Sequence, residues 1–297
     1  MILVAGGTGR LGTRVAGLLR ERGLGVRVLT RERSRAGRLG AGVEIVEGDV
    51  RVPAALMRSV EGVRTVVSAI HGFVGPRGAS PATVDRDGNR NLIRAAREAG
   101  VEHLVLVSVR DAAPDHPMDL MRMKHAAELM LKSSGLAWTI VRPTAFMETW
   151  CEVLCRPLLE KGRAVVFGRG RNPINWVSVM DVARFVELAI LDPALRGRTI
   201  EVGGPENLTM TEFIRVFQSE TGSVGRVGHV PLTAMRVGAG VMRLVNPALA
   251  RQMQAGVIMD TRPQAFSGQA PGLDHATASL TSLAEVVRRD FVVPRRE

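Results

Sequence analysis

The 297-residue chain contains no tyrosine and only two cysteines, and 4% of its residues are aromatic. The cysteines, Cys151 and Cys155, lie four residues apart in a predicted helix with no histidine cluster near them. We therefore predict buried or semi-buried thiols and no metal site. No apolar run reaches the roughly 18 residues of a membrane span. The N-terminus leads directly into a strand without a basic leader segment, so we expect a cytoplasmic protein with no membrane partner.

Lysine is also scarce: 37 of the 40 basic residues are arginines. The formal net charge is +11. These arginines are scattered over predicted helices and loops. Nucleic-acid-binding proteins more often combine a compact basic stripe with aromatic residues. We therefore expect no nucleic-acid partner. The hydrophobic fraction of 45% is ordinary for a globular protein.

Glycine is abundant, and its most informative use is near the N-terminus. Residues 2–5 form an apolar run typical of a strand buried on both faces. Glycines follow at positions 6, 7, 9 and 12, and residues 10–20 have the apolar spacing of a helix. Glycines between a strand and a helix let the backbone approach a pyrophosphate, which binds the free N–H groups of the helix N-terminus. The pattern predicts a dinucleotide site; the alternative is an ordinary glycine-rich turn.

Arginines follow the second predicted strand, Gly25–Thr30, where a dinucleotide fold meets the adenosine ribose. An acidic residue at this point favours NAD, whereas an arginine accommodates the 2′-phosphate of NADP. Here Arg31 comes directly after Thr30, and Arg33 and Arg35 follow closely. We predict NADP(H) as the cofactor; the alternative is a solvated basic loop.

Strands and helices alternate through the first half of the chain. This order predicts an α/β fold, a Rossmann-type doubly wound parallel sheet with a smaller C-terminal substrate-binding region. We place the NADP-binding domain at residues 1–148, with a strand and helix around 172–205 returning to it, and a mainly substrate-binding region at 149–297. The further strands of the first half are predicted at Val43–Glu47, Thr65–Ala69, His103–Ser108 and Ala137–Arg142, and the helices at Pro53–Val60, Val84–Ala99 and Met118–Ser133.

Several motifs resemble those of the atypical short-chain dehydrogenase/reductases, in the NmrA-like NAD(P)H-binding family. They are Val4–Gly12, Gly48–Val50, Val66–Ala69, Val105–Ser108, Lys124–Glu128, Ser134–Met147 and Trp176–Ala183. The resemblance implies that Gly6, Thr8, Gly9, Arg10 and Leu11 hold the pyrophosphate and that Arg31 meets the 2′-phosphate. It also implies that Asp49 and Val50 flank the adenine, that Ser68 and Ala69 lie under the ribose, that Pro143 to Phe146 line the nicotinamide, and that Lys124 binds the nicotinamide ribose.

The chain departs from this family at its catalytic pattern, Tyr-x-x-x-Lys. Leu120 stands four residues before Lys124, and there is no tyrosine elsewhere. Candidate catalytic residues are therefore Lys124, His71 and Ser108. Each has an alternative role: Lys124 as a cofactor ligand only, His71 as a loop histidine, and Ser108 as a structural or substrate-contacting residue. His116 is a further candidate acid.

The C-terminal half is less regular. We predict a helix over Thr149–Lys161, a family turn over Asn172–Asp181 leading into a helix over Val182–Leu191, and a mobile loop over Asp260–Ala278. We also predict strands at Arg163–Phe167 and Arg198–Val202, the latter in the main sheet, and helices at Thr209–Glu220 and Ser279–Asp290. A methionine-rich apolar stretch after Pro231 is either a lid over an apolar substrate or core and subunit packing.

Two functions fit these observations. The first is an NADPH-dependent reductase of a small apolar conjugated substrate, such as a quinone, enone, imine or polyketide-like molecule, because such acceptors take up hydride without a tyrosine. The second is an NADP(H)-binding regulator or redox sensor, or a non-redox enzyme such as a cyclase or epimerase. We expect a small-molecule partner and a monomer or homodimer.

Overall fold

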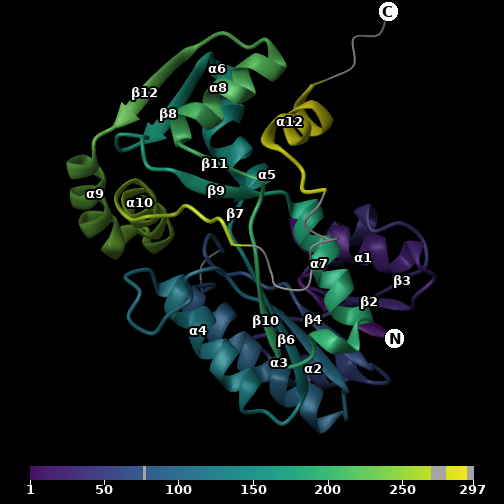
Figure 1. Ribbon diagram of the computed structural model, residues 1–297. Coiled ribbons are helices and arrows are strands. Elements are labelled where there is room, and N and C mark those ends of the chain that lie inside the picture. The colour runs from purple at the N-terminus through teal and green to yellow at the C-terminus, as the bar shows by residue number, and fades with distance from the viewer. Residues whose placement is uncertain (76–77, 269–278, 293–297) are drawn as a thin grey trace, which may run out of the picture. The chain divides into compact units, whose positions relative to one another are not determined.

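The computed structural model describes residues 1–75, 78–268 and 279–292 (Figure 1). It divides into two compact units. Unit 1 comprises Met1–Pro143 and Val182–Val202, and unit 2 comprises Thr144–Asp181 and the chain from Gly203 onward. Within the described ranges, no helix combines the length and apolar character needed to cross a membrane.

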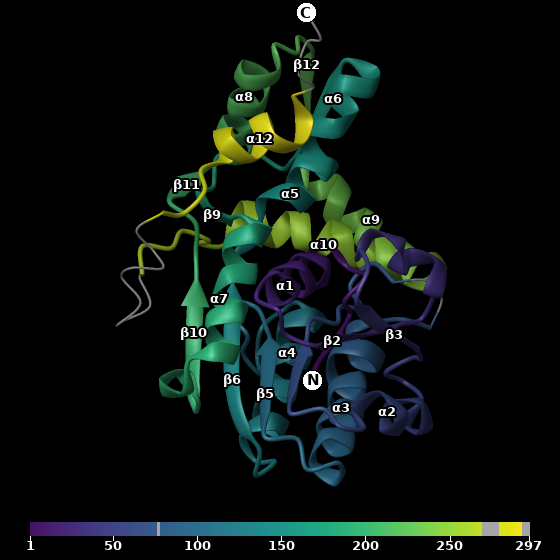
Figure 2. The same ribbon diagram turned by 90° about the vertical axis from the view of Figure 1, so that its right-hand side faces the viewer.

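Unit 1 is built on a seven-stranded sheet in the order β10-β6-β5-β4-β1-β2-β3, and every strand pair is parallel (Figure 2). This confirms the predicted Rossmann-type fold. Strand order reverses at β1, where the ligands of such sheets bind beyond the carboxyl ends of the strands. The strands are β1 (Ile2–Ala5), β2 (Val26–Thr30), β3 (Val43–Glu47), β4 (Thr65–Ser68), β5 (His103–Val107), β6 (Ala137–Pro143) and β10 (Arg198–Val202).

Helices cover both faces of this sheet. Helix α1 (Arg10–Glu21) and helix α7 (Val179–Leu191) share one face, because Arg22 at the end of α1 donates to Glu187 of α7 at 2.6 Å. The other face carries α2 (Pro53–Val60), α3 (Asp87–Glu98) and α4 (Asp119–Lys132), which pack against one another in sequence order. A π-helical turn, Pro81–Arg86, leads into α3.

The central strands form the core of unit 1. Every residue of β1 and of β5 is buried, as expected for parallel strands covered on both faces. Leu3, Leu104, Leu106 and Ile140 are fully buried beside Leu92 of α3. Each such side chain contributes roughly 1.5–3 kcal/mol through removal of apolar surface from water. This rigid centre fixes the loops at the carboxyl ends of the strands.

Unit 2 has its own core around Trp176, Phe213 and Phe217, all fully buried. Its sheets are a three-stranded one in the order β11-β9-β7 and a parallel pair, β8 with β12. Its strands are β7 (Ala145–Phe146), β8 (Arg163–Phe167), β9 (Ile174–Val177), β11 (Glu206–Leu208) and β12 (Arg226–Val230). Its helices are α5 (Met147–Trp150), α6 (Arg156–Lys161), α8 (Met210–Thr221), α9 (Leu232–Val245), α10 (Pro247–Thr261) and α12 (Leu283–Phe291).

Unit 2 differs from the sequence prediction at several boundaries. The predicted helix over Thr149–Lys161 is divided into α5, a π-helical turn and α6, where Pro157 supplies no backbone donor. The predicted turn over Asn172–Asp181 contains strand β9, and α7 begins at Val179. Of the predicted loop over Asp260–Ala278, the first two residues belong to α10, and residues 269–278 lie outside the described ranges. Both cysteines are buried as predicted, and burial raises the pKa of Cys155 to about 12.

Candidate cofactor and active site

The turn between β1 and α1 needs glycine where its backbone segments lie closest to one another. Gly6 has a φ of +82°, and a Cβ on Gly12 would lie 2.3 Å from the carbonyl oxygen of Gly6. Helix α1 therefore lies directly against the turn. Its first helical hydrogen bond runs from the Thr13 N–H to the Gly9 carbonyl at 2.9 Å, so the N–H groups of Arg10 and Leu11 precede it. With no acidic residue in its first turn, α1 presents donors and a partial positive charge to an anion.

The end of β2 lies beside this turn. The Thr8 and Thr30 hydroxyl oxygens are 3.2 Å apart, which links the glycine turn to the strand end. Arg31 follows with an exposed side chain. The neighbouring carboxylate of Glu32 accepts from Arg35 Nε at 2.8 Å, so this acid is already paired with an arginine. The local charge therefore suits an anionic group such as a 2′-phosphate better than a ribose hydroxyl pair.

The residues predicted to surround the adenosine occupy the ends of β3 and β4. Asp49 accepts from both Nε and Nη2 of Arg51, and this guanidinium holds the pKa of Asp49 below its usual range. Val50 is buried. Ser68 is also buried and donates to the Asn89 side chain at 2.6 Å, while the Ala69 N–H donates to the Ala5 carbonyl at 2.9 Å. The hydroxyl of Ser68 is thus directed toward α3.

Lys124 lies buried on α4 at the centre of a polar network. Its Nζ donates to the carbonyls of Ile70 at 3.0 Å and Val107 at 2.9 Å, at the ends of β4 and β5. Oδ1 of Asp85, a fully buried carboxylate, lies 3.1 Å from the same Nζ. Leu120, one helical turn earlier, is buried and carries no polar atom. The lysine side chain is therefore held in place by the chain itself, with no phenol beside it.

His71 follows β4 and lies at the edge of this network. Its side chain is 49% exposed, its ring stacks on Phe73 with centroids 6.0 Å apart, and its Nδ1 lies 3.9 Å from Asp85 Oδ1. The pKa of His71 lies below its ordinary value: removal of part of the ring from water lowers it most, the Asp85 carboxylate raises it, and the Lys124 ammonium lowers it further. Because solvent still reaches half of the ring, the first effect is incomplete, and a change in either charge should move this pKa.

The Ser108 hydroxyl is engaged with α4. It donates to the buried carboxylate of Glu128, which also accepts from Arg142 Nε at 2.9 Å and Nη2 at 2.5 Å. This arrangement ties the ends of β5 and β6 to the helix that carries Lys124. His116 is buried, and its Nδ1 accepts from the Met118 N–H at 3.1 Å.

The segment predicted to line the nicotinamide spans both units. Pro143 ends β6 in unit 1, where its carbonyl accepts from the Arg110 N–H at 2.9 Å. Phe146 belongs to β7 in unit 2 and is paired with Val177 of β9. The roles assigned to these two residues, like those of the other candidate site residues, stay predictions.

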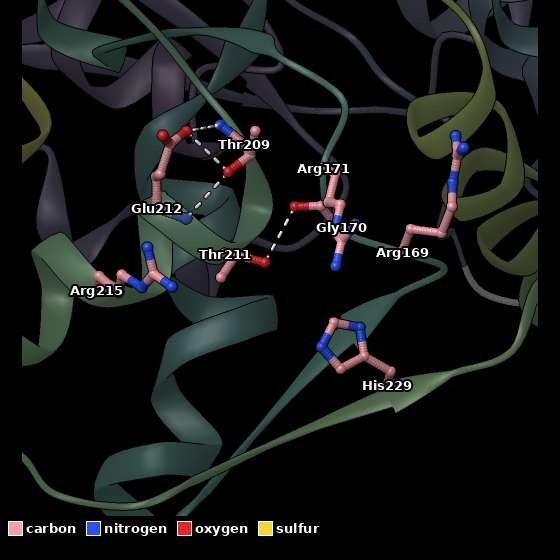
Figure 3. Close-up of a pocket in the computed structure, with 8 residues that line it drawn as sticks. All are labelled: Arg169, Gly170, Arg171, Thr209, Thr211, Glu212, Arg215 and His229. Carbon is pink, nitrogen blue, oxygen red and sulfur yellow. Dashed lines mark hydrogen bonds between the residues drawn. The ribbon is translucent and has the colours of Figure 1, made fainter.

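A separate recess of about 360 Å³ lies within unit 2, between the loop after β8, the start of α8 and strand β12 (Figure 3). Charged and polar residues contribute to its lining, and the carboxylate of Glu212 accepts from the Thr209 N–H and hydroxyl, both at 2.8 Å. None of the predicted cofactor or catalytic residues is part of its lining, which consists of Arg169, Gly170, Arg171, Thr209, Thr211, Glu212, Arg215 and His229.

Asp85 is the one member of the Lys124 network that the sequence reasoning missed. It lies 39 residues from Lys124, inside a segment expected to be a regular helix. One signal in the sequence could have indicated its burial. Asp85 follows the apolar residue Val84 and lies on the side of the predicted helix that faces the core. A carboxylate at such a position needs a buried partner, because an unpaired buried charge is costly.

Comparison with known proteins identifies the family. Residues 6–193 match the model of the NAD(P)H-binding family, and this chain belongs to it, in its atypical short-chain dehydrogenase/reductase, NmrA-like branch. The match extends from the glycine turn to the end of α7. The cofactor class is therefore NAD(P)H.

Individual relatives are similar along most of their length. The chain is 33% identical over 224 residues to an NAD(P)H azoreductase from Xenophilus azovorans, covering 75% of this chain and 74% of the relative. It is 30% identical over 240 residues to the photosystem II assembly factor Ycf39 of Synechocystis, covering 79% and 72%. The NADPH-dependent quinone oxidoreductase QOR2 of Escherichia coli, solved with NADPH, shares the fold with a TM-score of 0.77 at 22% identity, covering 97% of this chain and 99% of that one.

Proposed function

We propose that this protein is an NADPH-dependent reductase of small, apolar, conjugated acceptors such as quinones, enones, imines, polyketide-like molecules or azo compounds. The observation that carries the proposal is the combination of a glycine cradle at the start of α1 with a buried Lys124 beside which Leu120 replaces the family tyrosine. The similarity to an NAD(P)H azoreductase supports a reductase.

The residues of unit 1 suit the cofactor. The N–H groups at the start of α1 would hold the pyrophosphate, and Arg31 would pair with the 2′-phosphate, since Glu32 is already held by Arg35. When bound, NADPH supplies a hydride. Lys124 contributes a fixed positive charge at the ends of β4 and β5. A fixed cation favours binding of the cofactor and stabilises negative charge that develops on an acceptor.

The missing phenol limits the acceptors. An unactivated ketone develops a full alkoxide charge as hydride arrives, and it therefore needs a positioned acid. A quinone, enone or azo group spreads the same charge over several atoms and needs less assistance. The geometry around Leu120 therefore favours conjugated acceptors over simple ketones and alcohols.

A panel assay tests this function. Purified protein is mixed with NADPH and with quinones, enones, azo dyes and simple ketones, and the loss of NADPH absorbance is followed together with product formation. We expect turnover with at least one conjugated class and none with the ketones. Lys124→Met should abolish turnover, whereas Lys132→Met, at the end of the same helix, should retain it.

A second candidate is an NADP(H)-binding regulator or assembly protein, or a non-redox enzyme on the same fold. The Synechocystis relative, named as an assembly factor, and the missing tyrosine favour it. The two candidates differ in one measurable respect. A regulator binds NADPH tightly and consumes none across the whole panel, whereas a reductase shows acceptor-dependent consumption.

A further inference from the structure

Asp85 is the acid that Lys124 and His71 share. The π-helical turn Pro81–Arg86 places its carboxylate in the interior of unit 1, where it is fully buried. Oδ2 accepts from the Gly72 N–H at 2.9 Å, which fixes the loop that carries His71. Oδ1 lies 3.1 Å from Lys124 Nζ and 3.9 Å from His71 Nδ1. The carboxylate therefore contacts the loop and the lysine and lies near the histidine.

Asp85 Oδ1 is a buried acceptor that could take a further hydrogen bond. It is buried and makes no hydrogen bond of good geometry within the described residues, although the lysine lies close to it. A buried carboxylate oxygen in this state is costly unless a donor reaches it. The nearest ring donor is Nδ1 of His71, and a small rotation of that half-exposed ring would close the distance.

Burial and the nearby Lys124 ammonium both lower the pKa of His71, and burial has the larger effect. A cation close to an imidazole disfavours its charged form, and a carboxylate favours it. The charged groups that act on His71 are Asp85 from the turn and Lys124 from α4. Glu128, the acid one turn further along α4, is held by Arg142 and Ser108. Asp85 thus offsets the charge of Lys124 at the histidine.

We propose that Asp85 is a positioning residue that keeps a proton on His71 beside the fixed Lys124 cation, so that His71 replaces the missing tyrosine as the proton donor. The proposal rests on the reductase function proposed above. Nδ1–H of the ring points to Asp85, and Nε2–H is left for the acceptor. Half exposure of the ring gives solvent access for reprotonation.

The step balances as a two-electron reduction. Hydride addition to the acceptor forms a carbon–hydrogen or nitrogen–hydrogen bond and moves a π electron pair onto the terminal oxygen or nitrogen. His71 Nε2 gives its proton to that atom and keeps the Nδ1 proton, which Asp85 holds. The acceptor gains one hydride, which bound NADPH would supply, and one proton from His71, and Nε2 then takes up one H⁺ from solution.

An NMR titration of the cofactor-free protein tests the electrostatic part. The chain has six histidines, and the His71→Gln variant identifies the His71 imidazole signal. We expect Asp85→Asn to lower the titration midpoint of His71 by about one pH unit, given the distance and exposure. Asp87→Asn is the matched control, because Asp87 lies in the same stretch but pairs with Arg86 and Arg90. An unchanged midpoint in Asp85→Asn would overturn the proposal.

Lys124→Gln provides the second arm if Asp85→Asn does not fold. Removal of the cation should raise the midpoint of His71, and a midpoint that stays or falls contradicts the proposal. In turnover assays, the rate should fall as pH rises through the His71 midpoint. His71→Ala should lose at least tenfold in turnover and recover part of it with added imidazole. Full activity in His71→Ala would overturn the proton-donor role, whereas inactivity of the wild-type protein on every acceptor would instead refute the proposed function.

Discussion

The free energy of unfolding of unit 1 should fall by about 3 kcal/mol as the pH drops from about 6.5 to about 4, because of one histidine. His103 begins β5, is 1% exposed, and its Nε2 lies 3.0 Å from the Thr139 hydroxyl oxygen. That hydroxyl donates to the Leu195 carbonyl at 2.9 Å, so it accepts from His103, and the neutral ring carries its proton on Nε2. Within the described residues, the buried Nδ1 has no hydrogen-bond partner.

Protonation of this ring places an unpaired N–H and a charge in the core. Burial lowers the pKa of His103 to about 4, and the Arg196 guanidinium adds to this effect. The unfolded chain takes up the proton near pH 6.5, whereas the folded protein resists it until about pH 4. Between these values the unfolded state binds more protons, so stability falls with decreasing pH by about 1.4 kcal/mol per unit.

Urea denaturation across this pH range measures the free energy of unfolding. Hydrogen exchange of the β5 amides shows whether the measured transition is the unfolding of unit 1. His103→Gln keeps a donor for Thr139 and removes the titration. The difference between wild type and variant cancels the contributions of the other titrating groups, because these groups are the same in both proteins. Parallel profiles for the two proteins would refute the reasoning, because they would show that His103 is not protonated differently in the folded and unfolded states.

Three further predictions concern the candidate site. Gly12→Ala should lower NADPH affinity at least tenfold and destabilise unit 1, because its Cβ would meet Gly6 2.3 Å away; calorimetry with NADPH and thermal unfolding check both effects. Arg31→Ala should reduce the preference for NADPH over NADH by about 10-fold, the loss of one exposed charge-assisted hydrogen bond, as measured by the two dissociation constants. Leu120→Tyr places a phenol one turn before Lys124 and should add reduction of simple ketones, for which we expect no activity in the parent protein, in the same NADPH assay.

Much of unit 1 was predictable because its signals are local. The glycines before Arg10, the apolar runs of the parallel strands and the spacing of helix α1 each depend on neighbouring residues. Strand β10 was also predicted in the main sheet, although it pairs with β6 about 60 residues earlier. Short elements of unit 2 were missed, since β7 and β11 contain two and three residues and are defined by pairing with β9 rather than by their own sequences.

The candidate site was predicted in its backbone parts and missed in its side-chain partners. The glycine turn was predictable because a Cβ at these positions would collide with the backbone, so the sequence must contain glycine there. The partners of Lys124 come from the end of β4, the end of β5 and the turn at Asp85, and only the folded sheet brings them together. The Ser108 hydroxyl likewise donates a hydrogen bond to Glu128, a contact that sequence spacing does not reveal.

Transfer of an isotopic label tests the central claim most directly. The protein is incubated with NADPH that carries deuterium at both C4 positions and with the conjugated acceptors, and the products are analysed by mass spectrometry. If the protein is a reductase, one deuterium appears at carbon in an enone or imine product for each NADPH consumed. Quinone and azo products lose the label to water, so their reduction is followed as NADP⁺ that keeps one deuterium at C4. Tight binding of NADPH with neither labelled product nor NADP⁺ formation, or substrate conversion without NADPH consumption, would contradict the account and favour a regulator or a non-redox enzyme.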